Sequence, residues 1–297
     1  MITVFTPAYN RRHTLDKLYR SLNGQTCLDF EWLVIDDGST DGTEEWFEGI
    51  LSKDNLYPVT YIKQENGGKH RAINRGIKLA KGELFFIVDS DDSLLPSAIE
   101  KLSEWAEQVR GLENCAGISG MRGLDEKRYL GSFFDGNAEY IDATNLEREK
   151  YRLLGDKAEA YFTNVLLKYP FPEFEGEKFI TEEVVWNKIA MDGYFLRWYK
   201  DIIYICEYLD DGLTKSGNEK YRKSPQGTLY QTRQQLEIYK KNFKKRTLAI
   251  NFYYERVKGE KSISEAAKDM GVSVCRCRFA VFTVKCGHFL RKILGRG

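Results

Sequence analysis

Residues 82–96 read GELFFIVDSDDSLLP, a run of apolar residues that ends in carboxylates. The stretch from Leu84 to Val88 has the composition of a buried strand, and Asp89, Asp91 and Asp92 follow it within four positions. Like charges this close repel one another and raise each other's pKa. A divalent cation would offset them, because hard cations take carboxylate oxygens as ligands. The segment therefore predicts a buried strand with a metal site at its carboxyl end.

Strand and helix patterns alternate on both sides of this segment. The expected strands are residues 2–6, 30–36, 59–64, 84–88 and 115–121. The expected helices are residues 14–24 (capped by Thr14 and ended by Gly24), 43–51, about 70–80, and Pro96 to about 110. Alternation at this spacing predicts βαβ units and an α/β fold with a doubly wound, mostly parallel sheet. Residues 122–215 read as mixed and loop-rich.

Charge is distributed unevenly along the 297 residues, whose overall net charge is +1. Residues 216–297 hold 19 Lys and Arg against 6 Asp and Glu, and residues 1–215 hold 26 against 38. We therefore expect an acidic α/β domain over 1–215 and a basic α-helical region over 216–297, in which Ser262 and Glu265 form a capping box. The last helix is expected over about 276–294. A basic region of this kind suggests an anionic partner.

Some protein classes are disfavoured by the composition. No apolar run approaches the roughly 18 residues needed to span a bilayer. The N-terminal MITVFTPAYN lacks the layout of a signal peptide. The six cysteines are scattered, so reduced thiols are expected. These features predict a cytoplasmic protein.

Polar residues follow each of the first four expected strands. They are TPAYNR (6–11), DDGS (36–39), ENGGKHR (65–71) and DSDD (89–92). Ligands of open α/β sheets bind at the carboxyl ends of the strands. Tyr9 could lie along a flat base, and Asp36 could accept hydrogen bonds from its N–H groups. Gly67 and Gly68 allow the backbone to approach a ligand closely.

Charged residues at the same edge suit the remaining parts of a nucleotide. Lys69 and Arg71 could meet base, ribose or phosphate oxygens. Asp89 and Asp91 stand two residues apart, so in an extended segment they would share a face. One could then reach a ribose hydroxyl and the other a metal ion.

The motifs TPAYNR, VIDDGSTDGT and ENGGKHRAINRGIKLAKGELFFIVDSDD occur in this order over about residues 2–120. They resemble the GT-A-fold nucleotide-diphospho-sugar transferases of the family-two inverting glycosyltransferases. The resemblance implies a nucleotide-sugar donor, usually UDP-linked, bound by about residues 1–120. It also implies Mn²⁺ or Mg²⁺ at a DxD motif, with Asp89 and Asp91 as ligands. The implied donor-binding residues are Thr6, Pro7, Ala8, Tyr9, Arg11, Asp36, Asn66, Gly68, Lys69, Arg71, Asp89, Ser90 and Asp91.

An inverting transferase also needs a base that takes the proton of the acceptor hydroxyl. The family usually supplies it just before a helix that starts with apolar residues and Trp, and TEEVVWNKIA (181–190) is similar. The register puts Glu182 at the position of the base, with Glu183 as the alternative. Two glutamates at a helix start are also ordinary partners of the helix dipole. The acceptor side and the base are expected within 121–215.

Two further features of the sequence concern the acceptor and a possible membrane contact. Residues 155–179 and 207–215 resemble a bacterial subset that acts in capsule, exopolysaccharide or cell-surface glycan assembly, which implies a glycan or lipid-linked acceptor. The basic tail favours peripheral contact with an anionic membrane at the inner face of the cell. Alternatively, its helices pack on the catalytic domain or on a second subunit, so the oligomeric state stays open.

The same residues would also allow other functions. A nucleotidyltransferase could use the aspartates to bind two metal ions, and a non-catalytic scaffold could keep the fold and use the basic tail for assembly. Residues 262–279 are similar to a helix-turn-helix, but apolar FAVF follows its first arginines, so no nucleic acid is expected. The Cys and His residues of 275–288 are spaced more narrowly than zinc ligands.

Overall fold

The computed structural model describes residues 1–207 and 217–293, without the side chains of 285 and 287–293. The chain forms two compact units, which are described separately. The first comprises Met1–Phe171 and Val185–Gly212, and the second comprises Pro172–Val184 and Leu213–Gly297. The predicted boundary at 215/216 and the motif residues 208–215 lie outside the described residues.

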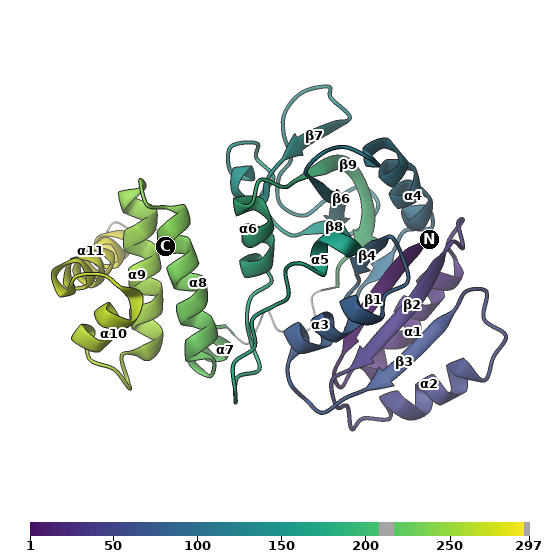
Figure 1. The fold of residues 1–297 in the computed structure, drawn as a ribbon, viewed down its shortest axis with the longest axis horizontal. Helices are drawn as coiled ribbons and strands as arrows, with labels where there is room; N and C mark the ends of the chain where they lie inside the picture. The colour runs from purple at the N-terminus through teal and green to yellow at the C-terminus, as the bar shows by residue number, and fades with distance from the viewer. Residues whose placement is uncertain (208–216, 294–297) are drawn as a thin grey trace. The chain divides into compact units, whose positions relative to one another are not determined.

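One mixed sheet organises the first unit (Figure 1). Its strands are β1 (Ile2–Ala8), β2 (Phe30–Asp36), β3 (Val59–Lys63), β4 (Leu84–Ile87), β5 (Ser93–Leu94), β6 (Cys115–Gly123), β7 (Tyr140–Ala143), β8 (Lys157–Phe162) and β9 (Phe195–Ile205). The order is β3-β2-β1-β4-β8-β6-β9-β5, and β7 pairs with β9. The pairs β1–β2, β2–β3, β1–β4 and β6–β9 are parallel. The expected α/β fold is confirmed, and the five expected strands correspond to β1, β2, β3, β4 and β6, whereas β5 was not predicted.

The second half of the sheet differs from the expectation of a loop-rich segment. Strand β8 runs antiparallel between β4 and β6, so β6 does not pair with β4. Strand β9 is 11 residues long and pairs with β5, β6 and β7. The expected mixed and loop-rich character of 122–215 holds for the long loops between these elements, but strands β7, β8 and β9 were not predicted.

The helices of this unit cover both faces of the sheet. They are α1 (Arg12–Asn23), α2 (Thr43–Leu51), α3 (Lys69–Leu79), α4 (Ala98–Val109), the 3₁₀ turn η1 (Asn145–Glu147), α5 (Thr163–Leu166) and α6 (Glu183–Met191), whose first two residues belong to the second unit. Val4 of β1 shares a core with α1, α2 and α4. Phe5, the next residue, points to the other face, where Gly76 of α3 leaves room for its ring. This alternation explains why residues 2–5 are all buried.

Two predicted helix starts need correction. Helix α1 begins at Arg12, not after Thr14, whose hydroxyl donates to the Arg11 carbonyl. Asn10, two residues after the end of β1, has the left-handed conformation (φ 52°), which turns the chain into the helix earlier than expected. Helix α4 begins at Ala98, two residues after Pro96.

The described helices of the second unit are α7 (Glu219–Arg222), α8 (Pro225–Ile238), α9 (Phe243–Val257), α10 (Ile263–Met270) and α11 (Val274–Ile293). The capping box of Ser262 and Glu265 is confirmed, and Gly271 ends α10 with φ 69°. The buried Glu177 carboxylate accepts the N–H groups of Gln226 (2.7 Å) and Gly227 (2.8 Å) at the start of α8. It thereby binds backbone donors that have no partner within the helix.

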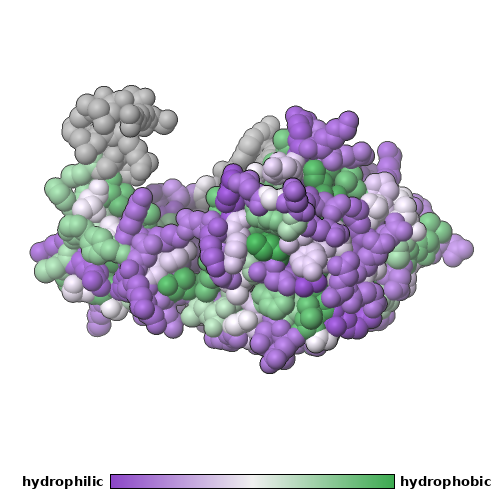
Figure 2. All heavy atoms as spheres, turned by 90° about the horizontal axis from the view of Figure 1, so that it is seen from above, coloured by the Kyte–Doolittle hydropathy of each residue, from purple (hydrophilic) through white to green (hydrophobic). Residues whose placement is uncertain are grey.

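Within the described residues, no helix combines the length and apolar character needed to cross a bilayer. On the face shown in Figure 2, hydrophilic residues predominate and hydrophobic residues form small separate patches.

Candidate active site

The first four strands bring their carboxyl ends to one edge of the sheet. Ala8 of β1 is in register with Asp36 of β2, and Asp36 with Lys63 of β3. The Val88 N–H donates to the Phe5 carbonyl (2.8 Å), so β4 ends beside β1. The polar segments that follow these strands are therefore neighbours, as the sequence predicts.

Two adjacent carboxylates order the loops at this edge. Asp36 is fully buried, and its oxygens accept the Ser39 N–H (2.8 Å) and the Tyr61 hydroxyl (2.5 Å). Asp37 accepts the N–H groups of Gly67 (2.9 Å) and Gly68 (2.7 Å). Gly68 has φ 97°, a conformation that favours glycine. The Asp37 contact was missed by the sequence analysis, since it joins loops about 30 residues apart.

Asp89 lies between two cations. Its oxygens contact Lys69 Nζ at 2.6 Å and Arg122 Nη1 at 3.5 Å. Burial would raise the pKa of Asp89, but the charges of Lys69 and Arg122 outweigh it and lower the pKa. Asp89 is therefore ionised at neutral pH.

The segment after β4 is a turn, which corrects the expected extended arrangement. The Asp92 N–H donates to the Asp89 carbonyl at 3.1 Å, closing a turn over 89–92. Ser90 is buried in this turn and Asp91 is half-buried. Asp89 and Asp91 thus do not share a strand face but stand on one tight turn.

Asp91 is the carboxylate of this turn that fits a cation. Burial raises its pKa, the negative charge of Asp89 adds to the rise, and Arg11 and Lys69 oppose it. A metal ion would stabilise such a carboxylate. No group of three or more His, Cys, Asp and Glu in the described ranges is arranged to hold a metal. A Mg²⁺-type site needs only one or two carboxylates when substrate phosphates supply other ligands, so Asp89 and Asp91 fit one.

Asp92 has a structural role. The Asp89 N–H donates to the Tyr204 hydroxyl (2.9 Å), which donates to Asp92 (2.7 Å). Asp92 also accepts the Glu207 N–H (2.8 Å). Arg122 lies over the Tyr204 ring, 4.1 Å from its centroid. These contacts fix the turn against β9. Sequence reasoning missed Arg122 and Tyr204 because both lie far along the chain.

The remaining predicted donor residues lie along the same edge. Tyr9 is half exposed, whereas Ala8 is buried and the Thr6 hydroxyl accepts the Trp32 Nε1–H at 3.0 Å. Arg11 donates to the Asn10 carbonyl (3.3 Å). Arg71 donates to the Gly67 carbonyl (2.6 Å). Pro7 and Asn66 are half-buried. Donor contacts of all these residues stay predictions.

Glu182 and Glu183 are grouped with the second unit, so they are not described together with the aspartates. Glu183 begins α6, and its carboxylate accepts from Gln231 Nε2 (3.3 Å). Within the first unit, Trp186 of α6 stacks on Tyr161 of β8 with ring centroids 4.3 Å apart. The expected helix start is confirmed, and the role of either glutamate as base stays a prediction.

The sheet topology and the polar edge at its strand ends place the protein in the class of GT-A-fold proteins. A family model described as glycosyl transferase family 2 matches residues 3–154, just over half of the chain. The chain belongs to this family.

Relatives agree with this assignment. Glycosyltransferase GlyG of Streptococcus pneumoniae is 38% identical over 109 residues, which are 36% of each chain. The chain thus spans about a third of the length of the curated relatives it matches. Among solved structures, Staphylococcus aureus TarS 1–349 in complex with UDP-GlcNAc has a TM-score of 0.64 at 18% identity, covering 96% of this chain and 92% of that one. Mannosyltransferase PcManGT of Pyrobaculum calidifontis, with GDP-Man and Mn²⁺, has a TM-score of 0.56 at 17% identity, covering 98% and 80%.

Proposed function

We propose that this chain is an inverting glycosyltransferase that moves a sugar from a nucleotide-diphospho-sugar, a UDP-sugar, to a hydroxyl of a glycan or lipid-linked acceptor. The supporting observation is the Asp89–Asp92 turn, which holds carboxylates and the cations Lys69 and Arg122 at the carboxyl edge of the sheet. Carboxylates suit a metal or a ribose hydroxyl, and cations suit a diphosphate.

The donor would bind along the strand ends. The exposed Tyr9 ring offers a surface for the base. Asp36 is fully buried, so its contact with a base N–H is proposed on the family resemblance alone. Lys69 and Arg71 lie on the first turn of α3, where the helix N-terminus also favours phosphate oxygens. Residues 1–120 would thus form the donor side of a catalytic domain over 1–215.

Asp91, together with Asp89, would hold a divalent ion, Mn²⁺ or Mg²⁺. When bound, such an ion would neutralise the charge of the departing nucleoside diphosphate. Asp92 is not proposed as a ligand of the ion, because its carboxylate already accepts hydrogen bonds from Tyr204 and the Glu207 N–H.

Glu182 would act as the base. The acceptor oxygen forms a bond to the anomeric carbon, the bond from that carbon to the diphosphate oxygen breaks, and Glu182 takes the hydroxyl proton. Attack opposite the leaving group inverts the anomeric configuration. Helix α6 starts directly after Glu182, which is where the family resemblance puts the base.

The acceptor side is proposed to include residues 121–215, and the biological role to be cell-surface polysaccharide synthesis. We place the protein in the cytoplasm, with residues 216–297 in peripheral contact with the anionic inner face of the cell membrane. Exposed Phe243, Phe279 and Phe282 among many Lys and Arg residues support this contact.

Thermal unfolding tests the donor and the metal together. UDP, GDP, TDP and CDP are added singly, each with Mn²⁺ or with a chelator. A ligand at about 100 times its Kd adds about 2.7 kcal/mol of stability, so the midpoint rises visibly. We expect a rise with UDP and Mn²⁺ that the chelator abolishes. A rise with another nucleotide would change the donor, and a rise with UTP accompanied by pyrophosphate release would indicate a nucleotidyltransferase. No rise with any nucleotide would favour the scaffold.

A further inference from the structure

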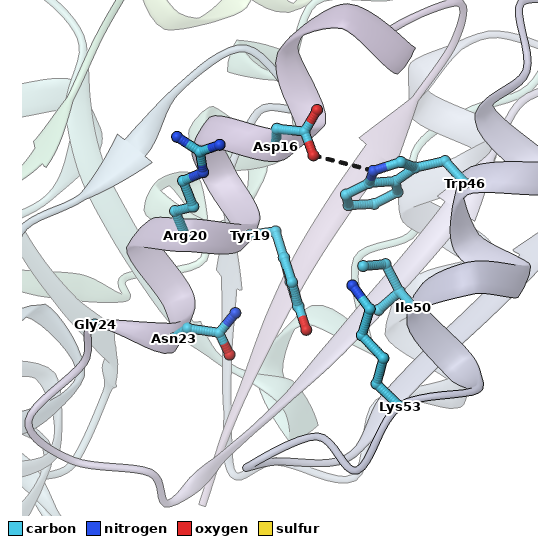
Figure 3. A pocket seen from close by; sticks show the side chains of 8 residues that line it. All are labelled: Asp16, Tyr19, Arg20, Asn23, Gly24, Trp46, Ile50 and Lys53. Atoms are coloured by element: carbon cyan, nitrogen blue, oxygen red, sulfur yellow. Dashed lines mark hydrogen bonds between the residues drawn. The ribbon is translucent and has the colours of Figure 1, made fainter.

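A pocket lies between α1 and α2, outside the candidate active site (Figure 3). It encloses about 470 Å³, within the range of about 300–1,000 Å³ usual for small-ligand sites. Asp16, Tyr19, Arg20 and Asn23 line it from α1, and Trp46 and Lys53 line it from the side of α2. At 1.5 Å per residue, Asn23 lies roughly 16 Å along α1 from Arg12, where the helix leaves the strand edge. None of the lining residues is a predicted donor residue, and at the other end of the pocket Asp16 pairs with Arg12 at 2.9 Å.

Two aromatic rings form the apolar part of the pocket, and hydrogen bonds hold both in place. Trp46 Nε1 donates to the Asp16 carboxylate at 3.1 Å, and the Tyr19 hydroxyl donates to Asn55 at 2.9 Å. The rings meet edge to face, with centroids 5.8 Å apart. Both side chains are half-buried, so part of each ring stays accessible. Because both rings are already held in place, little side-chain entropy is lost when a ligand packs on them.

Two cations stand at the rim of the pocket. Arg20 and Lys53 are exposed, and no ion pair among the described residues includes either of them, although Arg20 lies one helical turn from Asp16 and its charge lowers the pKa of that carboxyl. Figure 3 shows the Lys53 chain pointing toward the Tyr19 ring, with Nζ 5.5 Å from its centroid. Residues 1–215 carry 38 Asp and Glu against 26 Lys and Arg, so carboxylates are plentiful in this part of the chain. Cations left without one are available to an external anion.

We propose that this pocket binds an acidic saccharide, one whose sugar ring carries a carboxylate or phosphate. The apolar C–H face of a pyranose matches the accessible parts of Tyr19 and Trp46. Its hydroxyls match the Asn23 amide, which both donates and accepts, and its anionic group matches Arg20 and Lys53. Binding here needs neither a nucleotide nor a metal ion, so the site goes beyond the proposed sugar transfer.

Isothermal titration of the full chain with trigalacturonate at low salt tests the site. We expect the Arg20→Gln/Lys53→Gln double variant to bind at least tenfold more weakly than the wild-type chain. Both side chains are exposed, so the fold should be unaffected. The matched control is Lys78→Gln/Lys127→Gln, which removes two exposed cations elsewhere and should bind within twofold of wild type.

Comparison ligands separate the sources of affinity. Neutral maltotriose should bind more weakly than trigalacturonate, and inorganic phosphate more weakly still, since it lacks a sugar face. Binding that survives in the double variant, or phosphate binding as tight as trigalacturonate, would overturn the proposal, as would displacement by UDP with Mn²⁺. Trigalacturonate binding in a chain that binds no nucleotide would leave this inference standing while the proposed transfer fails.

Discussion

At the scale of single residues, three neighbouring aspartates have three different environments. Asp89 is balanced by Lys69 and Arg122, and Asp92 accepts hydrogen bonds from Tyr204 and the Glu207 N–H. Asp91 is partly removed from water and is repelled by the charge of Asp89, and both effects raise its pKa. A carboxylate in such a position lowers the free energy of unfolding of the metal-free protein. Functional sites commonly retain costs of this kind.

Replacing Asp91 by Asn should therefore separate stability from function. The change removes a charge that burial and Asp89 disfavour, so we expect the free energy of unfolding to stay equal or rise by up to about 1 kcal/mol. Sugar transfer should be lost, together with the effect of Mn²⁺ on the melting midpoint. Asp54→Asn, the same change at an exposed position, should alter neither property. An Asp91→Asn variant with wild-type turnover would refute the metal assignment.

Glu182 directly precedes α6 and Glu183 is its first residue, and their different surroundings make the predicted base testable. The Glu183 carboxylate accepts from Gln231, and a glutamine there can keep that bond. We expect Glu182→Gln to reduce transfer by about 10²–10⁴-fold, the usual contribution of a general base. Its affinity for UDP with Mn²⁺ should not change. Glu183→Gln should keep activity within a few-fold, and the reverse result would move the base by one residue.

At the scale of elements, the first half of the sheet was predictable because each strand is a continuous apolar run bounded by turn residues. Strand β9 was not, since Arg197, Lys200 and Asp201 interrupt its pattern. Arg197 is accommodated by a bidentate pair with Asp142 of β7 (2.7 and 2.8 Å). A partner 55 residues away cannot be inferred from local composition.

The same contrast applies to the candidate site. The strand-end residues could be predicted because parallel strands end at one edge of a sheet. Arg122 and Tyr204 reach Asp89 from β6 and from β9, whose positions depend on the unexpected insertion of β8. Sequence reasoning therefore predicted which residues meet at the carboxyl edge of the sheet, and it missed Arg122 and Tyr204, which contact Asp89 from β6 and β9.

Strand β8 contains a buried lysine that gives a testable dependence of stability on pH. Burial lowers the pKa of Lys157 to about 8, although Nζ donates to the Leu154 carbonyl (2.5 Å). Between pH 8 and about 10.5, the unfolded chain binds more protons at this residue, so its contribution to stability rises with pH. Below pH 8 the contribution is constant and at its least favourable.

Lys157→Met should remove this dependence and raise the free energy of unfolding at pH 7 by about 1–3 kcal/mol, at about 1.4 kcal/mol per pKa unit less the lost hydrogen bond. Urea unfolding from pH 7 to 10 measures it. The gap between variant and wild type should narrow as pH rises, while other titrating groups such as Cys115 cancel in the difference. Lys78→Met, at an exposed position, should give no pH-dependent gap. A constant gap for Lys157→Met would show that the lysine keeps its ordinary pKa.

At the scale of the whole molecule, opposite charges are segregated into different parts of the chain. Residues 1–215 carry an excess of carboxylates, and residues 216–297 carry 19 Lys and Arg against 6 Asp and Glu. In the helical unit, the buried positions of α11 include Cys277 and Ala280, whereas Phe279 and Phe282 on the same helix are 47% and 67% exposed. The centroid of the Phe279 ring lies 5.6 Å from that of the exposed Phe243 ring of α9. Exposed aromatic rings on a strongly basic unit suit an anionic lipid surface, where rings enter the interface and cations meet headgroups.

Sedimentation with vesicles tests this surface on the full chain. We expect binding to phosphatidylglycerol-containing vesicles but not to pure phosphatidylcholine, and release near 0.5 M NaCl, because salt shortens the range of electrostatic attraction. Phe279→Ser/Phe282→Ser should weaken binding, and Phe282→Ser alone, at the more exposed position, guards against an effect on folding. The control, Leu56→Ser/Leu167→Ser, removes two exposed apolar side chains from the first unit and should bind as wild type. Equal binding to both vesicle types, or no loss in either Phe variant, would instead favour packing of these helices on another protein surface.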